Sequence, residues 1–104
     1  MMDSYEVVWS KSAIRALSKM YNINPRTVFL QSKYILSQLP HKKAYDIVNY
    51  PGFDFNGYYW VLIRNVVIIY RISVIHKRVL IDAVYFANTK ETAEIFWGIG
   101  PDDK

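Results

Sequence analysis

The stretch Gly57-Tyr-Tyr-Trp-Val-Leu-Ile-Arg-Asn-Val-Val-Ile-Ile-Tyr-Arg-Ile72 decides the fold of this chain. It predicts two β-strands joined by a tight turn at Arg64-Asn65, because β-branched and aromatic residues dominate on both sides of that pair. The second strand contains an unbroken apolar run, Val66–Ile69. Successive side chains of a strand point to opposite faces, so this strand is apolar on both faces. Either the rest of the domain covers both faces or a partner covers one of them.

The length and composition predict one folded domain spanning residues 1–104. Hydrophobic residues make up 52% of the chain, which argues against disorder. No apolar run approaches the ~18 residues of a membrane helix, and the N-terminus lacks the apolar segment of a signal peptide. The chain contains no cysteine, which excludes disulfides and thiolate metal sites. We therefore expect a cytoplasmic protein that does not enter the membrane.

Charge is distributed unevenly along the chain. Eleven of the thirteen Lys and Arg residues and four of the nine acidic residues lie in residues 1–81, which gives this part a net charge of +7. Residues 82–104 have a net charge of −3, from two lysines and five acidic residues. A basic body with an acidic tail suits an anionic partner such as nucleic acid. A solvated surface that happens to be basic is the alternative interpretation.

The N-terminal half predicts a strand followed by two helices. Ser10 or Ser12 is suited to cap the first helix, and Asn24-Pro25 is a strong start for the second. Pro40 marks the end of the second helix. Because few residues separate the two helices, they should form an antiparallel hairpin. The expected elements are a strand over residues 5–9, a helix from 11 to about 21 and a helix from 25 to about 39.

The C-terminal half predicts a three-stranded meander and a final helix. Residues 40–57 are irregular, with a short strand expected around residues 44–48. A third long strand over residues 79–86 is interrupted only by Asp82. Asn88 should cap the last helix, and Gly98 should end it. The order is therefore β-α-α-β-β-β-α, an α+β fold in which a helical hairpin packs on one face of an antiparallel sheet.

This arrangement leaves the second face of the sheet open. Val67 and Ile69 would then be exposed apolar groups, and such patches usually mark a binding surface. Together with Trp60, these residues are the expected contact site for a protein partner.

The order of elements, the length and the hairpin resemble the RelE/ParE superfamily of bacterial toxins, the toxic halves of toxin–antitoxin pairs. Family members carry an opening strand like Tyr5–Trp9, then a glycine, a basic-aromatic strand and a strand ending Tyr-Arg-Ile. Here Gly57 to Ile72 fits that register without a gap, and Tyr70-Arg71-Ile72 matches its end. The resemblance covers roughly residues 4–97.

The resemblance implies growth arrest, most simply by ribosome-dependent cleavage of messenger RNA without a metal or other cofactor. It implies a cognate antitoxin as partner, together with the ribosome and messenger RNA, or DNA gyrase for the ParE branch. Cleavage by the 2′-hydroxyl needs a proton acceptor, cations for the phosphorane and a donor for the leaving oxygen. The candidate catalytic residues are Arg71 and Lys90. The candidate nucleic-acid contacts are Arg64, Lys42, Lys43, Lys77 and Arg78.

The sequence also departs from the family at functional positions. The family strand carries two Tyr-Arg pairs, in the pattern Tyr-Arg-x-x-Tyr-Arg-Ile, and Val66-Val67 occupies the place of the first pair. Phe96 occupies the place of a tyrosine in the final helix. Lys90 replaces an arginine, which keeps the charge but loses the planar guanidinium. Two histidines, His41 and His76, lie far apart in expected loops, and no metal-ligand spacing is present. A ParE-like inhibitor that acts by binding, or a non-catalytic member that only binds an antitoxin, are therefore the alternatives.

Overall fold

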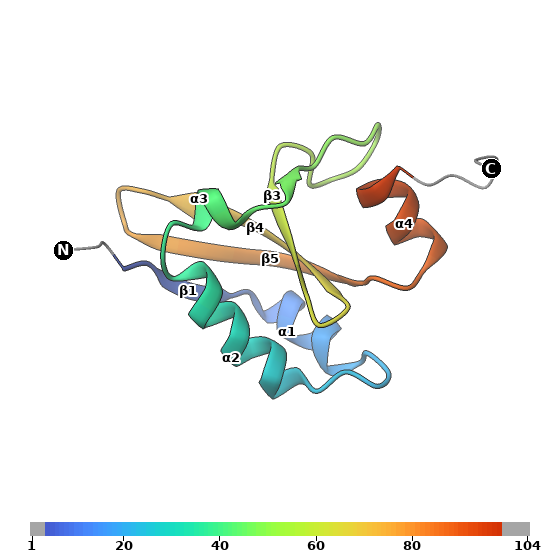
Figure 1. Cartoon of the computed structure of the whole chain (residues 1–104), viewed down its shortest axis with the longest axis horizontal. Helices are drawn as coiled ribbons and strands as arrows, with labels where there is room; N and C mark the ends of the chain where they lie inside the picture. The colour runs from blue at the N-terminus through green and yellow to red at the C-terminus, as the bar shows by residue number, and fades with distance from the viewer. Residues whose placement is uncertain (1–3, 99–104) are drawn as a thin grey trace.

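Five strands form one mixed sheet in the computed structural model, which describes residues 4–98 (Figure 1). The spatial order of the strands is β1-β5-β4-β3-β2. In chain order the elements are β1 (Glu6–Trp9), α1 (Lys11–Ser18), α2 (Pro25–Leu36), α3 (Pro40–Lys43), β2 (Asp46–Ile47), β3 (Tyr59–Ile63), β4 (Val66–Ser73), β5 (Arg78–Phe86) and α4 (Lys90–Trp97). The α+β class expected from the sequence is confirmed, β2 lies within the short strand expected around residues 44–48, and α3 is an additional short element.

The first strand pairs in parallel with the last. Residues Glu6–Trp9 of β1 lie beside Arg78–Ile81 of β5, whereas the other neighbouring strands run antiparallel. The expectation of an antiparallel sheet is therefore correct for β2 to β5 and wrong for β1. The chain between β1 and β5 passes through three helices and three other strands, so these two neighbours are not joined by the short hairpin that requires antiparallel strands.

The hairpin predicted at Arg64-Asn65 is present. Both residues adopt left-handed backbone angles, with φ of 52° and 64°. Positive φ at both central positions is the signature of the two-residue turn whose twist matches the flanking strands. The backbone oxygen of Asn65 also accepts a hydrogen bond of 2.8 Å from the Ala87 amide. The turn is thus tied to the segment that follows β5.

Asp82 forms a β-bulge in the middle of β5. Ile69 of β4 pairs with Ala83, whereas the next residue, Tyr70, pairs with Ile81. One extra residue on β5 shifts its alternation, so Ile81 and Val84 both face the same core. Apart from Arg78 at the start of β5, Asp82 is the only charged residue of this strand, and it coincides with the irregularity.

The helix caps follow the sequence closely, with shifts at three ends. The Ser10 and Asn24 side chains accept hydrogen bonds from the Ala13 and Thr27 amides, as helix N-caps do. Helix α2 ends three residues before Leu39, which adopts φ of 49° and lets Pro40 begin α3. Helix α1 ends at Ser18 rather than near residue 21. Thr89, not Asn88, caps α4, and Gly98 ends it in the left-handed conformation.

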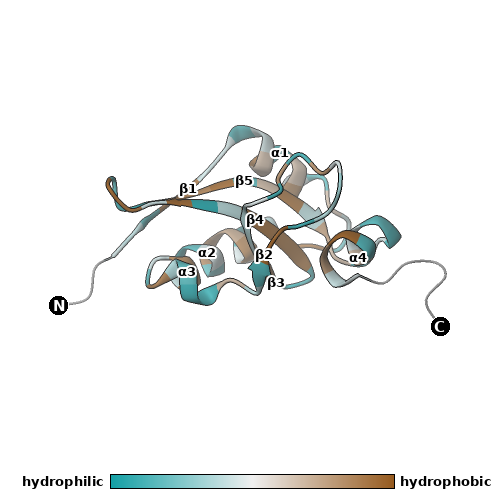
Figure 2. Ribbon diagram, turned by 90° about the horizontal axis from the view of Figure 1, so that it is seen from above, coloured by the Kyte–Doolittle hydropathy of each residue, from teal (hydrophilic) through white to brown (hydrophobic). Residues whose placement is uncertain are grey.

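The main core lies between the sheet and the α1–α2 hairpin. Helix residues Ala13, Leu17, Val28 and Leu36 pack against alternate residues of the strands. Tyr70 is fully buried there, and its hydroxyl donates a hydrogen bond of 2.7 Å to the Pro40 carbonyl. Burial raises the pKa of the Tyr70 phenol. Figure 2 shows the hydrophobic colouring concentrated along the central strands and the hydrophilic colouring over α3. In the described part of the chain, no helix is long and apolar enough to cross a membrane.

Candidate functional site

The second face of the sheet is not open where the sequence predicted a binding patch. Val67 and Ile69 are both 0% exposed, and Trp60 is 5% exposed. They form a second core with Val48, covered by aromatic residues of the irregular segment and by α4. The expected exposure of Trp60, Val67 and Ile69 is therefore wrong, and their predicted contact with a partner would require this cover to open. The apolar run Val66–Ile69 is explained by burial on both faces within the chain itself.

Aromatic contacts close this second core. Phe96 of α4 packs against Phe53, Trp60 and Tyr85, with ring centroids 5.2 to 6.0 Å apart. The Tyr50 hydroxyl donates a hydrogen bond of 2.9 Å to Glu94 Oε1, which ties the irregular segment to α4. That hydrogen bond raises the pKa of the Tyr50 phenol. Phe96 thus fills space in the core at the place where the resembling toxins carry a tyrosine.

The uncovered half of the second face lies toward the β4–β5 loop and contains Arg71. Its Nε donates to Asp82 Oδ2 at 2.9 Å, and the two side chains are 57% and 20% exposed. This hydrogen bond raises the pKa of the Arg71 guanidinium, with a smaller contribution from Tyr58. Arg78 contacts Glu6 in a similar pair, with Nε 3.3 Å from Oε1. Each arginine already has a carboxylate partner, so this half presents paired rather than free cations.

The two candidate catalytic residues do not lie together. Arg71 pairs with Leu80 across the sheet, and the strand continues to Phe86 before α4 begins at Lys90. Six residues of extended strand span about 20 Å. Arg71 and Lys90 therefore stand near opposite ends of β5, too far apart to act on one phosphate as placed here.

The candidate nucleic-acid contacts are divided between the two faces. Arg64 Nε donates a long hydrogen bond of 3.4 Å to Gln31 of α2, on the helical side. Lys42 and Lys43 lie on α3, which also belongs to that side, and Lys43 Nζ donates to the Ile35 and Gln38 carbonyls. Lys77 Nζ sits 5.4 Å from the ring centroid of Tyr5, which packs against the main core, whereas Arg78 faces Glu6 on the second face of the sheet. These five cations do not form one surface. His41 and His76 are exposed in α3 and in the β4–β5 loop, respectively.

The helical layer is the most basic part of the molecule. Residues 7–45 contain seven Lys and Arg residues and no Asp or Glu. All seven are exposed, and none forms an ion pair with another described residue. An apolar groove of about 340 Å³ runs between the two helices amid these cations. It is lined by Ile14, Leu17, Ser18, Pro25, Arg26 and Phe29.

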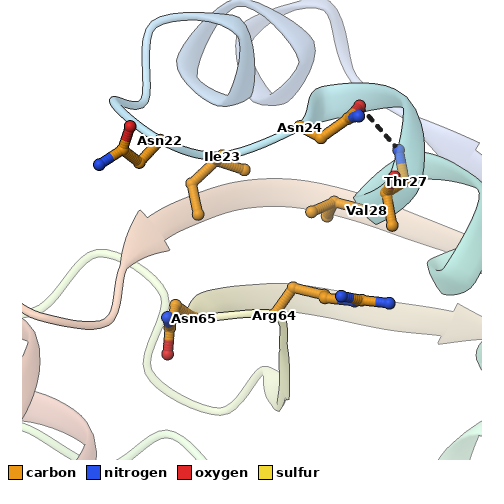
Figure 3. Close-up of a pocket in the computed structure, with 7 residues that line it drawn as sticks. All are labelled: Asn22, Ile23, Asn24, Thr27, Val28, Arg64 and Asn65. Atoms are coloured by element: carbon orange, nitrogen blue, oxygen red, sulfur yellow. Dashed lines mark hydrogen bonds between the residues drawn. The ribbon is translucent and has the colours of Figure 1, made fainter.

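A further cavity of about 430 Å³ separates the α1–α2 connection from the β3–β4 turn. Figure 3 shows that the Asn22 and Asn65 side chains point away from this space, while Asn24 is occupied in capping Thr27. Ile23, Val28 and the stem of Arg64 therefore form its nearest walls. This arrangement offers no converging set of catalytic groups. Within residues 4–98, no group of three or more His, Cys, Asp or Glu residues is placed to hold a metal ion.

Sequence reasoning missed the immediate surroundings of Arg71. Asp82 and Tyr58 are the groups that set its environment, and Asp82 was visible as the one polar residue in an apolar strand. The sequence also contains residues that indicate the cover over the second face of the sheet. Phe53 and Phe55 in the irregular segment, with Ile95 and Phe96 in the last helix, are too apolar to remain exposed together.

Neither a protein-family model nor a curated protein sequence matches this chain. Among solved structures, it is similar to a chain in the crystal structure of the toxin–antitoxin complex RelBE2 from Mycobacterium tuberculosis. The TM-score is 0.62 at 22% sequence identity, and the match covers 80% of this chain and 98% of that chain. At this identity the likeness establishes a shared fold. The α+β architecture expected from the sequence is therefore shared with a chain of a solved toxin–antitoxin complex.

Proposed function

We propose that this protein is the toxin component of a type II toxin–antitoxin module that arrests growth by binding its target. The shared fold with a chain of the RelBE2 toxin–antitoxin complex supports the first part. The observation that carries the second part is the burial of the half of the second sheet face that α4 and the aromatic residues cover. Val67 occupies the place of a family arginine, and it is fully enclosed beneath the aromatic cover. Arg71 and Lys90 are held apart, so no described cluster supplies both proton transfer and phosphate binding.

Cleavage of ribosome-bound messenger RNA is the second candidate function. Arg71 and its neighbour Tyr58 favour it, because Arg71 is exposed on the half of the sheet that α4 leaves uncovered. The family's ribonucleases use the same general face. DNA gyrase, as in the ParE branch, is the corresponding target for an inhibitor that acts by binding.

The two mechanisms differ in a direct test. We expect induced protein to arrest growth of a sensitive bacterial host and to leave messenger RNA intact in a translation extract at micromolar concentration. Supercoiling by gyrase is measured in parallel with the same preparation. Transcript cleavage that disappears in Arg71→Ala, but persists in the matched surface variant Arg15→Ala, would instead establish the ribonuclease. Normal growth in the presence of abundant folded protein would show that the protein is not toxic and only binds an antitoxin.

The antitoxin contact belongs on the helical layer in this proposal. An amphipathic helix can place its apolar stripe in the groove between α1 and α2. Acidic residues along that helix would face cations from both walls, since Arg15 follows Ile14 and Arg26 lines the groove itself. The absence of any acid in residues 7–45 makes the surface complementary to such a partner.

Ile14→Glu is expected to weaken antitoxin binding about 10- to 100-fold, which corresponds to roughly 1.4–3 kcal/mol. Ile14 is 46% exposed at the groove, so a carboxylate there removes apolar contact and repels an acidic helix without entering the core. Calorimetry with the product of the adjacent gene measures the effect. Ile75→Glu makes the same chemical change at a side chain in the β4–β5 loop that is 90% exposed, and it should leave the affinity unchanged. Equal affinities for both variants would show that the antitoxin does not bind in this groove.

A further inference from the structure

A pocket of about 320 Å³ lies between the β3–β4 turn and α4, on the side of the sheet away from the helical hairpin. The hydrogen bond from the Ala87 amide to the Asn65 carbonyl holds its two rims together. Its volume is at the lower end of the range of small-molecule sites, ~300–1,000 Å³. No acidic residue is among those that line it: Leu62, Asn65, Ala87, Asn88, Ala93 and Trp97.

An aromatic wall is provided by Trp97, whose residue surface is 40% exposed. Its ring lies 5.4 Å from that of the buried Trp60 with an interplanar angle of 69°, which supports one edge of the indole. Lys90, Ala93 and Trp97 follow one another at helical spacings of three and four, so they share one face of α4. The small Ala93 leaves room beside the indole, and the exposed Lys90 has no ion-pair partner among the described residues.

Two amide side chains complete the rim. Asn65 and Asn88 are exposed, and neither side chain hydrogen-bonds to any other residue in the described part of the chain. Figure 3 shows the Asn65 side chain turned away from the cavity beside Ile23 and Val28. Asn88 has no capping duty, because Thr89 caps α4. Each amide therefore offers a free donor and a free acceptor next to an aromatic face.

We propose that this pocket binds an unpaired nucleobase that carries a phosphate. The base stacks on Trp97, as bases stack on aromatic side chains in proteins that bind single strands. The amides of Asn65 and Asn88 contact the base edge, because an amide matches the adjacent donor and acceptor of a purine. Lys90 faces the phosphate. This binding is independent of whether the protein cleaves RNA, and it is separate from the groove assigned to the antitoxin.

Nuclear magnetic resonance on the isolated protein tests this site directly. The probes are AMP, a short oligoadenylate and an oligomer of equal length with abasic sugars. We expect AMP and oligoadenylate to shift the Trp97 indole and the Asn65 and Asn88 side-chain signals, whereas the abasic oligomer leaves them in place. Tighter binding of the oligomer than of AMP identifies a single strand as the ligand, and equal affinity identifies a free nucleotide. Unmoved signals at millimolar AMP and oligomer, or equal shifts with the abasic oligomer, would overturn the proposal.

Substitutions separate stacking from structural effects. Trp97→Ala should weaken oligoadenylate binding about tenfold, and Trp97→Phe should keep most of the affinity. Because loss of Trp97 also loosens α4, Asn88→Ala provides an independent check at an exposed residue outside both cores. We expect it to weaken binding severalfold, while Asn22→Ala, on the other cavity, has no effect. Wild-type affinity in both Trp97→Ala and Asn88→Ala would exclude this pocket.

Discussion

Replacing Val67 with arginine is expected to destabilise the folded protein by about 3–5 kcal/mol. Val67 is 0% exposed in the second core, where Trp60 and the aromatic cover leave no water for a guanidinium. An uncompensated charge at such a position costs several kcal/mol. This is a large fraction of the stability of a small domain, typically 5–15 kcal/mol in total. Urea unfolding followed by tryptophan fluorescence measures the change.

The control introduces an arginine in place of another β-branched apolar residue, at an exposed position. Ile75→Arg in the β4–β5 loop should alter stability by less than about 0.5 kcal/mol, as surface substitutions usually do. Hydrogen exchange of the α4 amides shows whether Val67→Arg also expels the cover. A Val67→Arg protein with wild-type stability and a protected α4 would mean that the second face is open in solution. That result would also restore Val67 and Ile69 as candidates for partner contact.

The hairpin and its flanking elements were predictable because local residues dictate them. Arg64-Asn65 sits between two β-rich runs, and Asn24-Pro25 carries its own helix-start signal. Such signals depend on backbone conformation within a few residues. The shift of the α2 end from Leu39 to Leu36 belongs to the same local category, because boundaries depend on small differences near a proline.

The cover over the second face was not predictable in the same way. Its formation depends on α4 returning across the sheet to meet Phe53, a contact between residues separated by more than forty positions. The periodicity of one strand shows that both faces are apolar, but it does not show whether the cover is internal or comes from a partner. The separation of the two candidate catalytic residues was not predictable for a related reason. In the sequence, Arg71 and Lys90 both match positions of the same family pattern. The strand that lies between them nevertheless separates them in space.

Tyr70→Ala is expected to destabilise the protein by about 3–5 kcal/mol, comparable to the Val67→Arg effect. Tyr70 is fully buried, and its ring stacks on Tyr59 with centroids 5.7 Å apart. Removing the ring leaves a cavity between β4 and the helical layer, and it also leaves the Pro40 carbonyl without its donor. Tyr70→Phe keeps the ring and loses only the hydroxyl, so it should cost about 1–2 kcal/mol. Thermal and urea unfolding of the pair separate packing from hydrogen bonding, and equal losses in both variants would show that the ring contributes nothing.

The same pair predicts a pH dependence with a definite sign. Burial raises the pKa of Tyr70 above its ordinary value of about 10, so the folded state favours the protonated phenol. Its contribution to stability is therefore complete below about pH 10 and falls as the pH rises beyond that value, by up to about 1.4 kcal/mol per unit. Tyr70→Phe lacks the titrating group and should lose less stability between pH 9 and 11. Urea unfolding across this range measures the difference in unfolding free energy between the two proteins. The lysines are common to both proteins, so their titration cancels in this difference. Parallel curves for wild type and Tyr70→Phe would show that the phenol is accessible to solvent in the folded state.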